Sequence, residues 1–85
     1  MNDNKVLVTL YVPLIEKKYE LFLPVSRRID EVLVLISKAL RDITDDSYYF
    51  RNDERLYNRI TGQEYKFSEI IKNTNIRNGS QLIFI

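Results

Sequence analysis

The stretch 29-IDEVLVLISKALR-41 decides the fold, because it is the segment with the clearest helical period. Its apolar residues recur at spacings of three and four, which gathers them into one stripe on a helix: Ile29, Val32, Leu33, Ile36 and Leu40. Acidic residues at its start and basic residues at its end suit the helix dipole. The pattern predicts one main helix over about residues 27–41, with Ser26 as the N-cap or with a start nearer Ile29.

Two strands precede this helix. Residues 5–12, KVLVTLYV, alternate with period two and place Val6, Val8, Leu10 and Val12 on a core face. Pro13 and a charged cluster then predict a hairpin loop over residues 13–18. Residues 19–23 return as an antiparallel strand that ends at Pro24, with Leu21 and Leu23 on the core face.

The segments after the helix are shorter. The aromatic run Tyr48-Tyr49-Phe50, followed by Arg51, predicts a third strand over residues 48–51. Three residues are expected to pack on the core, with a short strand around the first of them: Leu56, Tyr57 and Ile60. A short helical turn is expected near residues 67–72, and a last strand over residues 82–85. We expect an α+β fold in one domain, residues 1–85, whose four- to five-stranded mixed sheet carries one helix and pairs its first and last strands in parallel.

The composition excludes several classes of function. The 85 residues carry a net charge of +1, too little to attract nucleic acid. The absence of cysteine removes disulfides and thiolate sites, and suits the cytoplasm. We find no signal-peptide pattern and no apolar run near the roughly 20 residues that cross a bilayer, so neither export nor membrane insertion is expected.

The sequence contains few residues that could carry out catalysis. The chain lacks histidine, the commonest general base, and we expect no enzyme activity, metal or cofactor. The pairs Asp45-Asp46 and Asp53-Glu54 could serve glycoside hydrolysis or bind Mg²⁺ or Ca²⁺, but adjacent carboxylates in polar loops usually face water. Arg27-Arg28 with Lys17-Lys18 could form a basic patch for an acidic partner, although a solvated face is the commoner outcome.

The aromatic residues suggest both a core and a binding surface. Tyr48, Phe50, Phe67 and Phe84 are expected in the core. Residues that alternate away from them predict a protein-binding patch on the outer sheet face: Tyr49, Ile83 and Ile85, with Tyr11 or Phe22 nearby. We expect a monomer, with a dimer through an exposed strand edge left open.

The element order, the pattern Ile29-x-x-Val32-x-x-x-Ile36 and the closing Ile76-x-x-Gly79-Ser80-x-Leu82-x-Phe84 resemble ubiquitin and its β-grasp relatives. Tyr19-Glu20-Leu21-x-Leu23-Pro24 before the helix looks most like the bacterial YukD/EsaB-type proteins associated with type VII secretion. The resemblance implies a protein-binding adaptor or regulator whose partners are secretion-machinery components. In ubiquitin the outer sheet face carries the main protein-binding patch, and Tyr49 and Ile83 are expected at matching positions.

The chain departs from ubiquitin-type modifiers at its end. Those modifiers carry a flexible tail ending in Gly-Gly, whereas this sequence ends at Ile85 within the predicted last strand. If these are the natural ends, neither conjugation nor a sulfur-carrier role is expected. The alternative is a processed modifier or sulfur carrier, which would require an encoded extension ending in Gly-Gly.

Overall fold

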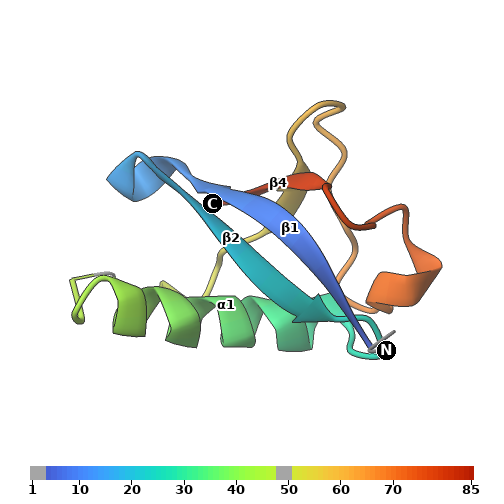
Figure 1. The fold of residues 1–85 in the computed structure, drawn as a ribbon, viewed down its shortest axis with the longest axis horizontal. Helices are drawn as coiled ribbons and strands as arrows, with labels where there is room; N and C mark the ends of the chain where they lie inside the picture. Colours follow the sequence, from blue (N-terminus) through green and yellow to red (C-terminus); the bar gives the residue numbers. More distant parts are fainter. Residues whose placement is uncertain (1–3, 48–50) are drawn as a thin grey trace.

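The computed structural model describes residues 4–47 and 51–85, and its helix lies along one side of a curved sheet (Figure 1). Two short 3-10 helices accompany the main elements. The order is β1 (Lys5–Val12), a 3-10 helix (Pro13–Ile15), β2 (Lys17–Pro24), α1 (Ile29–Ile43), β3 (Leu56–Asn58), a second 3-10 helix (Ile71–Asn73) and β4 (Gln81–Phe84). The predicted α+β architecture with one main helix is confirmed.

Within the described residues the sheet has four strands in the order β2-β1-β4-β3. β1 and β4 form the predicted parallel pair, with Leu10 opposite Leu82. β2 is antiparallel to β1, and β3 is antiparallel to β4. β3 confirms the short strand expected around Leu56. Tyr48–Phe50, the main part of the other predicted strand, lie outside the described residues, and Arg51 is not part of a strand.

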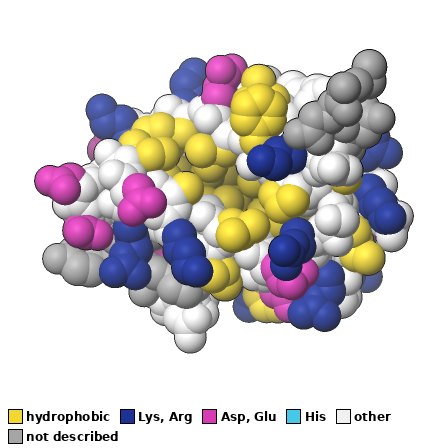
Figure 2. Space-filling view, turned by 60° about the horizontal axis from the view of Figure 1, so that its bottom comes forward, with side chains coloured by type: hydrophobic (Ala, Val, Ile, Leu, Met, Phe, Trp, Pro, Cys, Tyr) yellow, Lys and Arg dark blue, Asp and Glu magenta, His cyan; other side chains and the backbone are white. Residues whose placement is uncertain are grey.

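Helix α1 begins at Ile29, the later of the two predicted starts, and ends at Ile43, two residues beyond the predicted end. Its N-cap is Arg28 rather than Ser26, because the Glu31 carboxylate accepts a hydrogen bond from the Arg28 N–H at 3.0 Å. The Ile29 N–H donates to the Glu69 carbonyl at 2.8 Å, which ties the first turn to a distant loop. The predicted apolar stripe is buried, while Val34 and Leu35 on the same helix are exposed. Figure 2 shows one face of the molecule on which apolar side chains gather among charged ones.

The strands bury the residues that period-two alternation selects. Val8, Leu10 and Val12 are buried, while Val6 is half-buried and packs against the core. Leu23 is buried, and Leu21 packs at the core's margin. The helical stripe covers this face, so apolar residues of α1 and of the sheet form one core.

The predicted core position of one aromatic residue in the irregular segment is wrong, and another aromatic residue is buried there. Phe67 was predicted in the core but is 42% exposed, with the Arg55 guanidinium 4.6 Å from its ring centroid. Tyr65 is buried instead, and its hydroxyl donates to Asn75 Oδ1 at 2.6 Å. A tyrosine can fill this part of the core because its polar end finds a hydrogen-bonding partner.

The connection after β3 corrects two further predictions. Ile60 is 78% exposed rather than packed, because it lies in a tight turn whose N–H groups at Ile60 and Thr61 donate to the Asn58 side chain at 2.9 and 3.1 Å. The helical turn covers Ile71–Asn73 rather than residues 67–72. Backbone bonds from Ile71 and Lys72 to the chain before α1 hold it in that position.

Candidate functional site

The acidic residues of the two pairs lie in different environments. Asp45, Asp46 and Asp53 are exposed, as predicted. Glu54 was expected to face water but is 3% exposed, and it accepts a hydrogen bond from the Arg51 N–H at 3.0 Å. Across residues 4–47 and 51–85, no group of three or more His, Cys, Asp or Glu side chains could hold a metal ion.

The arginines before α1 are paired rather than gathered into a basic patch. Arg27 Nη1 lies 3.4 Å from Glu31 Oε2, and Arg28 Nε lies 3.1 Å from Asp30 Oδ1. These exposed pairs make the expected solvated face.

In the described part of the chain, no helix has the length and apolar character needed to cross a membrane.

The outer face of the sheet carries a row of apolar side chains across three strands. Tyr11 of β1 lies opposite Ile83 of β4, and Ile83 lies opposite Tyr57 of β3. Directly opposite residues of neighbouring strands point to the same face of the sheet, so these three side chains are neighbours. All three are partly exposed on the face away from α1. We call Tyr11, Ile83 and Tyr57 the outer apolar row.

A cation and a polar row border the outer apolar row. The Arg59 guanidinium lies 5.1 Å from the Tyr11 ring centroid and donates to Gln81 Oε1 at 3.1 Å. Gln81 is opposite Thr9, which is opposite Glu20. The outer face therefore offers an apolar strip with hydrogen-bonding groups beside it, as the centre and rim of a protein interface do.

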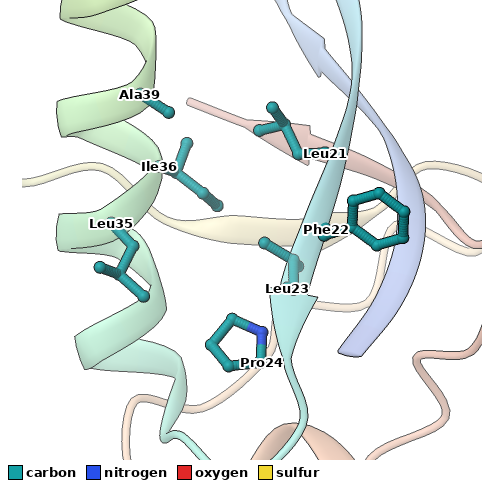
Figure 3. A pocket seen from close by; sticks show the side chains of 7 residues that line it. All are labelled: Leu21, Phe22, Leu23, Pro24, Leu35, Ile36 and Ala39. Carbon is teal, nitrogen blue, oxygen red and sulfur yellow. The ribbon is translucent and has the colours of Figure 1, made fainter. Parts of the chain in front are cut away.

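The other predicted residues lie at different distances from this row. Ile85 is exposed and exchanges two backbone hydrogen bonds with Arg55, of 2.6 and 3.1 Å, which place it on the same face as Ile83 by alternation. Phe22 is 65% exposed, but it lies opposite Leu7, and the Glu20–Thr9 pair separates it from Tyr11. Figure 3 shows its ring on the side of β2 away from α1.

One member of the row was missed from the sequence, and one predicted member cannot be placed. Tyr49 lies outside the described residues. Tyr57 was expected on the core, yet it is the neighbour of Ile83 on the outer face. The signal was present: Leu56 is buried, and adjacent residues of a strand point to opposite faces.

Neither protein-family models nor curated proteins match this sequence. Solved structures do match. The N-terminal ubiquitin-like domain of the 4931431F19Rik protein has a TM-score of 0.75 at 19% identity, covering 99% of this chain and 76% of that one. The ubiquitin-like domain of the Mycobacterium tuberculosis type VII secretion system protein ECCD1 has a TM-score of 0.73 at 12% identity, covering 95% and 97%.

A ubiquitin-like domain of an Arabidopsis thaliana protein is a third neighbour, with a TM-score of 0.66 at 17% identity, covering 96% of this chain and 77% of that one. At these identities the likeness concerns the fold. The predicted ubiquitin-like β-grasp fold is thus confirmed, while function has to be argued from surfaces.

Proposed function

We propose that residues 1–85 form one domain that acts as a non-catalytic, ubiquitin-like protein-binding adaptor or regulator. The observation that supports this most is the outer apolar row, which lies partly exposed across three strands on the face that α1 does not cover. A solvent-facing apolar strip is stabilised when a partner covers it.

We further propose that the partner belongs to a bacterial type VII secretion machine, and that the chain works in the cytoplasm as a monomer without nucleic acid. Two lines support the assignment: the resemblance to YukD/EsaB-type proteins, and the similarity in fold to the ubiquitin-like domain of ECCD1. The net charge of +1 favours a protein partner over a polyanion.

The row has the composition of an interface centre. Tyr11 and Tyr57 combine a large apolar ring with a hydroxyl that can bond at the rim, and tyrosine is enriched among residues that dominate binding energy. Ile83 lies between them and fills the strip. Ile85 extends the same face at the end of β4, and Phe22 is a separate contact beside Leu7.

Calorimetric titration against the purified cytoplasmic domains of a type VII membrane ATPase tests the proposal. We expect the double substitution Tyr57→Ala, Ile83→Ala to weaken binding at least about tenfold, because truncation of the few residues that dominate an interface costs about 2 kcal/mol or more. Ile60→Ala is the matched control, since Ile60 is exposed in the turn beyond β3. It should bind like the unmodified chain.

The two parts of the proposal fail separately. Full affinity in the double variant would exclude the outer apolar row as the binding surface. If the unmodified chain binds none of the secretion components, the type VII assignment is wrong, whatever the row does elsewhere.

A further inference from the structure

A second surface lies at the end of the sheet where β1 begins and β2 ends. Figure 1 shows the 3-10 helix Ile71–Asn73 at this same end of the molecule. A groove of about 270 Å³ lies between these segments, lined by Val6, Val25, Lys72, Ile76 and Arg77. None of these residues belongs to the outer apolar row, so the two surfaces can be tested separately.

The floor of the groove is apolar and is held in place by the fold. Ile76 is buried, and Val6 and Val25 pack against the core. The Lys72 N–H donates to the Val25 carbonyl at 2.9 Å, which ties the 3-10 helix to the chain that leaves β2. Because this floor is formed before a ligand binds, the entropy cost of binding an aliphatic group on it is low.

Two cations border the groove. Lys72 and Arg77 are exposed, and no ion pair joins either one to another side chain in the part of the chain that the structure describes. Arg77 Nη1 donates to the carbonyls of Thr74 and Ile76, at 2.7 Å each, which leaves the Nε and Nη2 donors for a ligand. None of the residues that line the groove is acidic. The charge at its rim therefore complements an anion.

Backbone groups of β1 lie at the margin of the groove. The Val25 N–H donates to the Asn4 carbonyl at 2.8 Å, so alternation directs the N–H and C=O groups of Lys5 away from β2. No hydrogen bond from another described residue reaches these two groups. Lys5 adjoins Val6, so they are placed to pair with one peptide group of a ligand in the groove.

These features together select the ligand. Nucleic acid or polyphosphate would leave the apolar floor unused, and such polyanions bind through many cations, which a net charge of +1 does not provide. A neutral aliphatic group would not use Lys72 or Arg77, and a fatty acid has no peptide group for Lys5. We propose that the groove binds the C-terminus of another protein, with its carboxylate at Lys72 and Arg77 and an aliphatic last side chain on the floor.

Short peptides test this directly. The probe is Ac-Ser-Gly-Ser-Val-Leu with a free carboxylate, and its C-terminal amide is the matched control. Titration of the free acid into the ¹⁵N-labelled chain should shift the amides of Val6, Val25, Lys72 and Arg77. The amide should bind at least about tenfold more weakly, because it forms no charge-assisted hydrogen bond with either cation. Serine in place of the last leucine should weaken binding about three- to tenfold, since less apolar surface is buried.

Two exposed lysines provide a matched pair of variants. Lys72 lines the groove, whereas Lys18 lies opposite Tyr11, near the other end of β1. Lys72→Glu and Lys18→Glu change the net charge equally. Lys72→Glu should weaken the free-acid probe about five- to tenfold, because it replaces an attraction with a repulsion. Lys18→Glu should leave the affinity within about twofold, since salt screens charges that are far apart.

Three results would overturn the inference: no amide shift at the groove, equal affinity of the free acid and the amide, or equal effects of Lys72→Glu and Lys18→Glu. Octanoate that binds as tightly as the free-acid peptide would also overturn it, since the ligand would then be a fatty acid rather than a protein C-terminus. The Tyr57→Ala, Ile83→Ala variant should bind the probe normally, so failure of this groove is distinguishable from failure of the outer apolar row.

Discussion

The two faces of this sheet show how alternate residues of the same strands take different roles. Leu82 and Phe84 of β4 are buried under α1, whereas Ile83 between them is partly exposed on the outer face. The same contrast separates Leu56 from Tyr57 on β3. Side chains on the helix side fill the core, so their removal would leave a cavity, whereas a side chain on the outer side is already partly in water and its removal would leave none.

The largest effect should come from the buried face. Phe84→Ala removes a fully buried ring from a central strand, and we expect a loss of about 3–5 kcal/mol in the free energy of unfolding. Urea denaturation followed by circular dichroism measures it. Phe84→Leu, which keeps most of the volume, should lose less than half as much, and equal losses in both variants would argue against a cavity effect.

Tyr65→Phe tests how much the hydrogen bonds of a buried tyrosine contribute to stability. Its hydroxyl donates to Asn75 Oδ1 at 2.6 Å and accepts from Asn58 Nδ2 at 3.1 Å. Removing it leaves the ring in place but breaks both bonds, so we expect a loss of about 1–2 kcal/mol. Thermal and urea unfolding check this value. A variant as stable as the unmodified chain would mean that water replaces the hydroxyl.

Gly79→Ala tests the turn that leads into β4. Gly79 has φ of 87° and its N–H donates to the Leu7 carbonyl at 2.8 Å, while a Cβ would meet no atom within 4 Å. The cost is therefore conformational, about 1–2 kcal/mol by urea unfolding. Since Asn tolerates this region, Gly79→Asn should cost less than Gly79→Ala, and the opposite order would point to a packing effect.

The smallest effect is expected at the end of the outer face. Ile85→Ala should change the free energy of unfolding by less than about 0.5 kcal/mol, because the side chain is exposed and its backbone bonds to Arg55 are kept. Urea unfolding of Ile85→Ala and Phe84→Ala under the same conditions compares the free energies of unfolding at two adjacent residues. A loss above about 2 kcal/mol would show that the outer face also carries the fold.

Periodicity predicted the parts of the molecule whose burial follows a regular repeat. The structure confirms the buried stripe from Ile29 to Leu40, the alternating burial along β1 and the parallel pairing of β1 with β4. Helix boundaries were less predictable, because the cap at Arg28 depends on the Glu31 carboxylate and on a bond to Glu69 far along the chain.

The irregular segment shows what local patterns leave out. Tyr65 and Phe67 are aromatic residues two positions apart, and which of them is buried depends on Asn58, Asn75 and Arg55, which reach them only in the folded chain. Tyr57 was recoverable in principle, because Leu56 defines the opposite face. The burial of the Glu54 carboxylate could not be predicted from the sequence, because an acidic loop residue is normally solvated.

The most direct measurement compares Leu82→Ala with Ile83→Ala, neighbours on one strand that point to opposite faces. We predict that Leu82→Ala lowers the free energy of unfolding by about 2–5 kcal/mol, whereas Ile83→Ala lowers it by less than about 1 kcal/mol and weakens binding of the proposed partner, the secretion ATPase. Equal destabilisation by both substitutions, with binding by Ile83→Ala unchanged, would contradict the division of the sheet into a folding face and a binding face.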